Sequence, residues 1–146
     1  MRKRIALCLA PACLGLFLNT CTQLVHSPTP SLPYRWYIAF PPWKTTHFNK
    51  GDYVWFAYPP APYPLIKRIV GTEGDAIKHD KDHQIWVNDT WIGKPISPQE
   101  PGMTMNRVAK NTVFVAGTHP QSLDSRYQTI GLIETTKIIG KLFPLW

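Results

Sequence analysis

Short apolar runs, each ended by prolines, glycines or polar residues, follow one another along most of the chain. After residue 25, no stretch keeps apolar side chains at the 3.6-residue spacing of an amphipathic helix. Short runs rich in β-branched and aromatic residues are typical of β-strands. The expected strands span residues 35–40, 52–58, 65–70, 76–79, 84–87, 91–92, 112–116 and 138–142. Residues 93–107 contain three prolines and are predicted to form an irregular excursion.

The N-terminal segment has a different pattern. Arg2, Lys3 and Arg4 precede the uncharged run 5–18, and about 21 residues up to Val25 carry no charge. At a rise of 1.5 Å per residue, a helix of that length reaches ~30 Å, the thickness of a bilayer core. A basic start before an apolar run is typical of a signal peptide or signal anchor, and the positive charges predict a cytoplasmic N-terminus. We therefore expect a signal anchor or signal peptide over 1–25 and a separate domain over 26–146.

Three fates of this segment stay open, with an anchor favoured over cleavage or lipidation at Cys21. Leu18-Asn19-Thr20-Cys21 loosely resembles a lipoprotein box, but Asn and Thr stand where small residues are usual. All 3 cysteines lie within the first 21 residues. The remaining domain is therefore neither a disulfide scaffold nor a cysteine-ligated metal site.

Composition narrows the class of the domain. The chain has 146 residues, which suits one domain, and its 44% hydrophobic content argues against disorder. Its 15 prolines exclude a helical bundle. The net charge is +7, yet three of the basic residues lie at positions 2–4, and no Lys/Arg cluster with interleaved aromatics predicts nucleic-acid binding. The domain is expected to be mainly β.

A lysine in an apolar strand is the first candidate for chemistry. In the run 65–70, Leu65, Lys67 and Ile69 share one face of the expected strand. If that face is buried, the ammonium loses hydration, its pKa falls, and the neutral amine can act as a general base. The alternative is a charged gatekeeper of an edge strand, whose head reaches water.

Ser31 is the candidate nucleophile, since the domain has no cysteine. It lies between Pro30 and Pro33 in a proline-rich stretch, 26–33, that is expected to be extended. These prolines would stiffen the backbone and fix the direction of the hydroxyl. Ser27 is a weaker candidate. The alternative for both is an ordinary serine in a proline-rich tether.

A polar loop, 117–127, follows the expected strand 112–116 and supplies further candidates. Ser122 could hydrogen-bond the lysine amine and aim it, while Asp124 and Arg126 could pair across the loop. Loops after strands often carry site residues. A surface turn without function is the alternative.

These three elements together resemble the signal peptidase I family of membrane-anchored serine proteases with a Ser/Lys dyad. Residues 67–75, Lys-Arg-Ile-Val-Gly-Thr-Glu-Gly-Asp, are similar to the lysine box of that family. Residues 117–127, ending in Asp-Ser-Arg-Tyr, are similar to its C-terminal box. The segments 49–54, 87–89 and 139–141 also resemble family segments, with Asp89 in place of a usual glycine. The resemblance covers about residues 27–146 in the family's order and implies a signal-peptidase-like β domain.

The nucleophile box differs from that of the housekeeping enzymes, in which proline stands three residues after serine. Ser31-Leu32-Pro33 places it two residues after, which resembles the TraF-type peptidases that process pilin precursors in conjugative plasmid transfer. That subgroup commonly has a glycine shortly after this proline. In this chain Tyr34 and Arg35 stand there instead. The short chain and the single hydrophobic segment also favour the TraF-type subgroup over a housekeeping signal peptidase.

The resemblance implies a mechanism. Ser31 would attack the scissile carbonyl and Lys67 would accept its proton, with Ser122 orienting the amine and Asp124 and Arg126 holding the loop. The backbone N–H of Ser31 and the Thr29 hydroxyl would stabilise the oxyanion. Neither a metal nor an organic cofactor is expected. The implied substrate is a pre-pilin or other precursor protein, and the implied location is the bacterial inner membrane with the domain in the periplasm, or a secreted or lipidated form.

Other classes remain open. A catalytically inactive relative acting as a scaffold or envelope lipoprotein is the main alternative, whereas the hydrophobic N-terminus argues against a self-cleaving repressor. Aromatic residues such as Trp36, Tyr37, Trp43 and Trp55 follow the expected membrane exit. They either contact the bilayer surface or pack in the core, with core packing at least as well favoured for Trp55.

Overall fold

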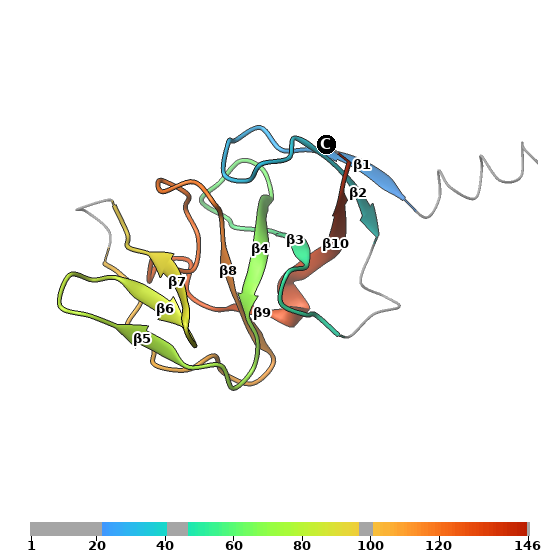
Figure 1. Cartoon of the computed structure of the whole chain (residues 1–146). Coiled ribbons are helices and arrows are strands. Elements are labelled where there is room, and N and C mark those ends of the chain that lie inside the picture. Colours follow the sequence, from blue (N-terminus) through green and yellow to red (C-terminus); the bar gives the residue numbers. More distant parts are fainter. Residues whose placement is uncertain (1–21, 41–46, 97–100, 146) are drawn as a thin grey trace, which may run out of the picture.

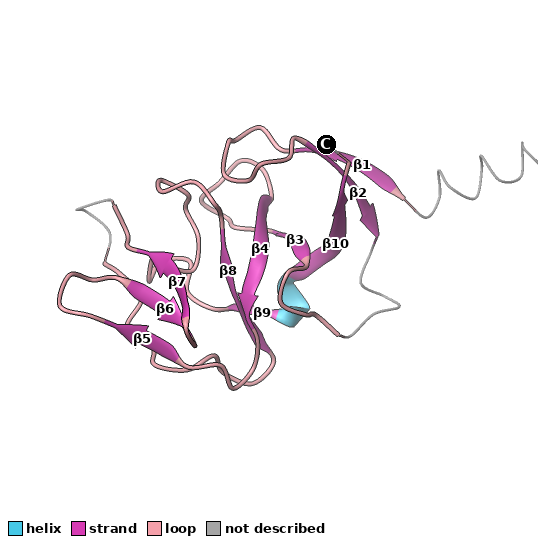
Figure 2. Cartoon of the chain, in the orientation of Figure 1, coloured by secondary structure: helices cyan, strands magenta, loops and turns pink. Residues whose placement is uncertain are grey.

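The computed structural model describes residues 22–40, 47–96 and 101–145, and within them the chain is mainly β, as the sequence predicts (Figures 1 and 2). The segment expected to form a hydrophobic helix, Ile5–Leu18, lies outside the described residues, as does Cys21. Among the described residues, no helix is long and apolar enough to cross a membrane.

Seven strands form the larger sheet, in the order β1-β2-β10-β3-β4-β8-β9, and every neighbouring pair is antiparallel. Strands far apart in the sequence are neighbours, because β10 inserts between β2 and β3. The sheet consists of β1 (Gln23–His26), β2 (Trp36–Phe40), β3 (Tyr53–Phe56), β4 (Leu65–Gly71), β8 (Thr112–Ala116), β9 (Ile133–Glu134) and β10 (Ile138–Pro144), with a short 3-10 turn, η2 (Thr135–Lys137), before β10.

Three shorter strands form a second antiparallel sheet to one side of the first (Figure 1). They are β5 (Ile77–His79), β6 (Ile85–Val87) and β7 (Thr90–Gly93). The predicted irregular excursion follows β7, and its described residues contain no strand beyond Gly93. Two isolated bridges, Ala76–Arg107 and Gly102–Tyr127, tie this region to the rest of the domain.

The sequence pattern located most strands but missed two. β9 is only two residues long, so it shows no alternation of apolar and polar residues. β1 contains Gln23, Leu24 and Val25, which were counted with the hydrophobic N-terminal segment, so the boundary expected at residues 25/26 falls inside this strand. Val25 is buried against β2, which explains why the strand forms there.

Strand β4 contributes to two parts of the core: the face of Leu65, Lys67 and Ile69 is buried, and on the other face Ile66 is buried while Arg68 is exposed. Leu65 and Ile69 pack with Val54 and Val115 in one apolar cluster. Ile66 points the other way, into a second cluster that includes Val25, Leu32, Tyr37 and Leu142. Because Lys67 shares a face with Leu65 and Ile69, the fold places its side chain toward the first cluster.

The end of β4 joins the two sheets at a close contact. Gly71 lies against Val87 of β6, Val108 and Phe114 of β8. A Cβ atom added at this glycine would lie 2.8 Å from Val87 Cγ1 and 3.1 Å from Phe114 Cβ. Phe114 is fully buried in the third apolar cluster, which contains residues of β5 and β6. The absence of a side chain at Gly71 thus permits the two sheets to pack.

We expect Gly71→Ala to destabilise the domain by about 1–3 kcal/mol, the usual cost of forcing volume into a packed core. Lys78→Ala, at an exposed position of β5, is the control and should change the free energy of unfolding by less than about 0.5 kcal/mol. Urea denaturation of both variants measures the difference. A Gly71→Ala protein as stable as the wild type would mean that the sheets separate there without cost.

Candidate active site

Lys67 is buried in the middle of β4, with a relative exposure of 2%. It lies opposite Val54 of β3, on the face that carries Leu65 and Ile69. The expectation that the face of Lys67 is buried is confirmed. The alternative, a charged residue that protects an edge strand, is wrong, because the side chain is almost fully buried and β4 lies between β3 and β8.

Burial lowers the pKa of the Lys67 ammonium from its ordinary 10.5 to about 8. Desolvation is the largest cause, since removing water disfavours the charged form. The Asp124 carboxylate raises the pKa and the Arg126 guanidinium lowers it, so these two neighbours oppose each other. A substantial fraction of the amine is therefore neutral near pH 8.

Ser31 lies in the loop between β1 and β2 and is also buried, at 8% exposure. Its hydroxyl oxygen is 2.7 Å from the hydroxyl oxygen of Thr29. Its carbonyl oxygen accepts hydrogen bonds from the backbone N–H groups of Thr118, at 2.8 Å, and His119, at 3.3 Å. The proline-rich segment is thus fastened to the loop after β8 and is not a free tether.

The serine and the lysine line the same cavity, which has a volume of about 320 Å³. Thr29 and Ser122 also line it, so the structure brings together four of the six residues singled out from the sequence. Apolar side chains form much of the remaining wall. The other lining residues are Pro30, Ala61, Tyr63, Leu65, His119, Gln121 and Leu123.

Gly117 permits the close approach of the two loops. A Cβ atom at this position would lie 2.7 Å from the carbonyl oxygen of Ser31 and would also collide with the Ser122 side chain. Ser122 is 3% exposed, and its hydroxyl has no hydrogen-bond partner among the described residues. A buried hydroxyl without a partner is costly, so this group is free to interact with the lysine amine or with a bound ligand.

Asp124 and Arg126 form a buried ion pair behind the cavity, as the sequence predicts. The Arg126 guanidinium donates from Nε at 2.9 Å and from a terminal nitrogen at 2.8 Å to the two carboxylate oxygens of Asp124. The same guanidinium donates to the carbonyl oxygens of His119 and Ser122. The backbone N–H of Gly117 donates to Asp124 at 2.8 Å. These bonds fix the loop that carries Ser122.

Sequence reasoning missed some of the cavity residues, and of its two candidate serines only Ser31 lines the cavity. The Ser27 hydroxyl is buried and donates to the Thr29 carbonyl oxygen at 3.2 Å, and Ser27 does not line the cavity. His119 and Tyr63, which the sequence pattern did not single out, also line the cavity. Both lie in loops, where periodicity gives no signal about side-chain direction.

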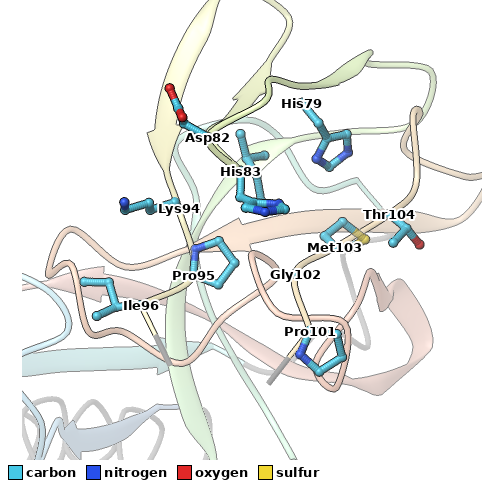
Figure 3. Close-up of a pocket in the computed structure, with 11 residues that line it drawn as sticks. His79, Asp82, His83, Lys94, Pro95, Ile96, Pro101, Gly102, Met103 and Thr104 are labelled. Carbon is cyan, nitrogen blue, oxygen red and sulfur yellow. The ribbon is translucent and has the colours of Figure 1, made fainter. Parts of the chain in front are cut away.

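A second cavity, of about 900 Å³, lies beside the small sheet and is unrelated to this chemistry (Figure 3). Its lining includes His79, Asp82, His83, Lys94 and Met103, and neither Ser31 nor Lys67. The described residues bring no three His, Cys, Asp or Glu side chains together as a metal site requires. The smaller cavity is therefore the candidate active site.

Comparisons with known proteins agree with the geometry. Residues 3–146 match the family described as signal peptidase, peptidase S26. Signal peptidase I of Pseudomonas aeruginosa is 35% identical over 55 residues, which span 37% of this chain and 19% of that protein. The chain thus matches about a fifth of the length of this relative.

Among solved structures, the crystal structure of a signal peptidase I from Enterococcus faecalis is similar at 20% identity, with a TM-score of 0.47. The similarity covers 67% of this chain and 98% of that one. The family match alone extends over nearly the whole sequence, including the segments that contain Ser31, Lys67 and Ser122. The chain belongs to the S26 family of signal peptidases, which are serine-type peptidases.

Proposed function

We propose that this protein is a serine endopeptidase that cleaves precursor proteins with Ser31 as nucleophile and Lys67 as general base. The observation that carries the proposal is a buried amine with a pKa lowered to about 8 in the same cavity as a serine hydroxyl. At a pH of about 8, a lysine with an ordinary pKa would be protonated and could not accept a proton. The inactive scaffold is less well supported, because the cavity retains both groups.

The proposed reaction has two steps. The Ser31 oxygen attacks the carbonyl carbon of the scissile bond while Lys67 Nζ accepts the hydroxyl proton. The C–N bond then breaks, and the Lys67 ammonium gives that proton to the leaving amine. In the second step, water attacks the resulting ester, Lys67 takes a proton from the water, and the proton returns to Ser31 as the acid product leaves.

Thr29 is proposed to stabilise the oxyanion together with the backbone N–H of Ser31. Its hydroxyl oxygen lies 2.7 Å from the nucleophilic oxygen, so it is close to the carbon that Ser31 attacks. A donor held in a cavity with little water stabilises developing charge without reorganisation. Ser122 is proposed to orient the lysine amine, and Asp124 and Arg126 to hold the Ser122 loop.

The proposed substrate is a pre-pilin or another precursor, cleaved next to the inner membrane, with the hydrophobic segment before β1 as the anchor and the domain in the periplasm. The Ser31-Leu32-Pro33 spacing favours a TraF-type peptidase of conjugative transfer, which belongs to type IV secretion, over a housekeeping enzyme. Co-expression with candidate precursors, followed by mass measurement of the mature product, tests this assignment.

We expect Ser31→Ala and Lys67→Met each to lower cleavage of a precursor by about 10⁴-fold or more, because each removes a group on which the covalent step depends. Ser27→Ala is the matched control, since Ser27 is buried nearby and does not line the cavity. It should keep most of the activity. Cleavage by Lys67→Met at the wild-type rate would exclude the proposed dyad.

The pH dependence of kcat/KM follows from the pKa of Lys67. The neutral amine is the active form, so activity should rise with pH and reach half of its maximum near pH 8. The rate with a soluble peptide, measured between pH 6 and 10, gives the midpoint. A midpoint near the ordinary lysine value of 10.5 would contradict a desolvated base.

Thr29→Val should lower kcat by about 10²–10³-fold and change KM little, as expected for a donor that acts in the transition state. Thr29→Ser retains the hydroxyl and serves as the control, with activity close to that of the wild type. Steady-state kinetics on a soluble peptide distinguishes the two variants. Equal losses in both variants would assign Thr29 a packing role.

A further inference from the structure

The larger cavity, of about 900 Å³ beside the small sheet, has the size and the apolar wall of a ligand site. Ile85 of β6 and Met103 form part of this wall and are almost fully buried, at 1% and 4% exposure. Both belong to the third apolar cluster, so this side of the cavity is packed and preformed. Ile96 also lines the cavity but is 46% exposed, which leaves apolar surface open to a partner.

Three side chains that can donate hydrogen bonds line the same cavity, namely His79, His83 and Lys94. His79 Nε2 lies 2.9 Å from the carbonyl oxygen of Met105, so this nitrogen donates and the ring is held in place. The side chains of His83 and Lys94 are exposed and make no hydrogen bond with the described residues. These two groups are therefore available to a ligand.

A carboxylate is the ligand group that suits these donors. Among the described residues that line the cavity, Asp82 is the only acid. In Figure 3 its carboxylate points away from Met103, whereas the rings of His79 and His83 point toward it. Charge-assisted hydrogen bonds from lysine or imidazole to a carboxylate are among the stronger polar contacts. The lining thus favours an apolar ligand that also carries an acidic group.

The wall of this cavity is hydrogen-bonded to the loop that carries Ser122. The Met103 N–H donates to the Arg126 carbonyl oxygen at 2.9 Å, and the Ile96 N–H donates to the Tyr127 hydroxyl at 3.0 Å. The Arg126 guanidinium in turn donates to the Ser122 carbonyl oxygen at 3.2 Å. The two cavities are therefore held in a fixed relation to each other.

One polypeptide can reach both cavities. Arg126 lies four positions after Ser122, a span of at most ~14 Å, and Arg126 is bonded directly to Met103. An extended segment of about eight residues is ~26–29 Å long, which exceeds this separation. A substrate whose scissile bond lies beside Ser31 can thus place a more distant segment in the larger cavity.

We propose that the larger cavity is an exosite that binds a segment of the precursor outside the residues around the scissile bond. The segment it takes is extended and apolar and carries an Asp or Glu side chain. The proposal rests on the peptidase proposed above and adds a determinant of which precursors are cleaved. Binding at a second site raises the local concentration of the scissile bond and lowers KM, while kcat stays the same.

The test compares two substrates of the full-length enzyme. One is a precursor found to be cleaved in the co-expression described above, and the other is a peptide of only three residues on each side of its cleavage site. Lys94→Glu should raise KM for the precursor by about 3–10-fold, leave kcat unchanged, and alter cleavage of the short peptide by less than about twofold. Ile96→Ser should raise KM for the precursor by about threefold, because it removes apolar contact.

Lys81→Glu is the matched control, because Lys81 is exposed in the turn between β5 and β6 and does not line the cavity. It makes the same change in charge and should leave KM for both substrates unchanged. A precursor whose acidic residues outside the six-residue core are replaced by Lys should reverse the effect. Its KM should be lower with Lys94→Glu than with the wild type.

Three results would overturn the exosite. Unchanged precursor KM in both cavity variants would show that the cavity takes no part in binding, and equal losses on the two substrates would show an effect on the catalytic site. An equal KM of the Lys-substituted precursor with both enzymes would exclude recognition of an acidic group. Failure of the wild type to cleave either substrate would instead refute the peptidase itself, and the exosite with it.

Discussion

The burial of one amine within a β-sheet is the constraint on which the candidate site depends. Lys67 sits on the face of β4 that carries Leu65 and Ile69, opposite Val54. An ammonium in that position loses hydration, and the cost appears as a pKa lowered to about 8. The packing that stabilises the domain is therefore also what makes the lysine a base, and a looser sheet would return the amine to its ordinary basicity.

A buried carboxylate beside this lysine presents an electrostatic problem. Asp124 is fully buried and raises the pKa of Lys67, so by itself it would keep the amine charged. Arg126 forms a two-pronged ion pair with Asp124 and lowers the pKa of the same lysine. The ion pair thus provides hydrogen bonds that hold the Ser122 loop. At the same time, the effect of each partner on the pKa of Lys67 is offset by the effect of the other. This explains how a charged pair and a neutral amine coexist in one buried region.

The sequence predicts the strands and the chemistry of single residues better than it predicts their proximity. Alternation along residues 65–70 places Lys67 on the face shared with Leu65 and Ile69, and prolines and glycines mark most strand ends. Nothing in the pattern reveals that Ser31 and Lys67 line one cavity, since that arrangement depends on the strand order β10-β3-β4 and on a loop after β8. Only the resemblance to a family supplied it. The contact at Gly117 is equally hidden, because it involves the Ser31 carbonyl oxygen, 86 positions away in the sequence.

The position of the nucleophile is set by the fold at both ends of its loop. At one end, the Ser27 N–H donates to the Arg35 carbonyl oxygen at 2.8 Å and continues the pairing of β1 with β2. At the other, the Ser31 carbonyl oxygen is held by the Thr118 N–H. Ser31 lies five positions after His26, the end of β1, a span of at most ~18 Å. The segment that carries the nucleophile is therefore held by hydrogen-bonded β-structure on one side and by the loop after β8 on the other, so its place beside the Lys67 cavity follows from the strand pairing itself.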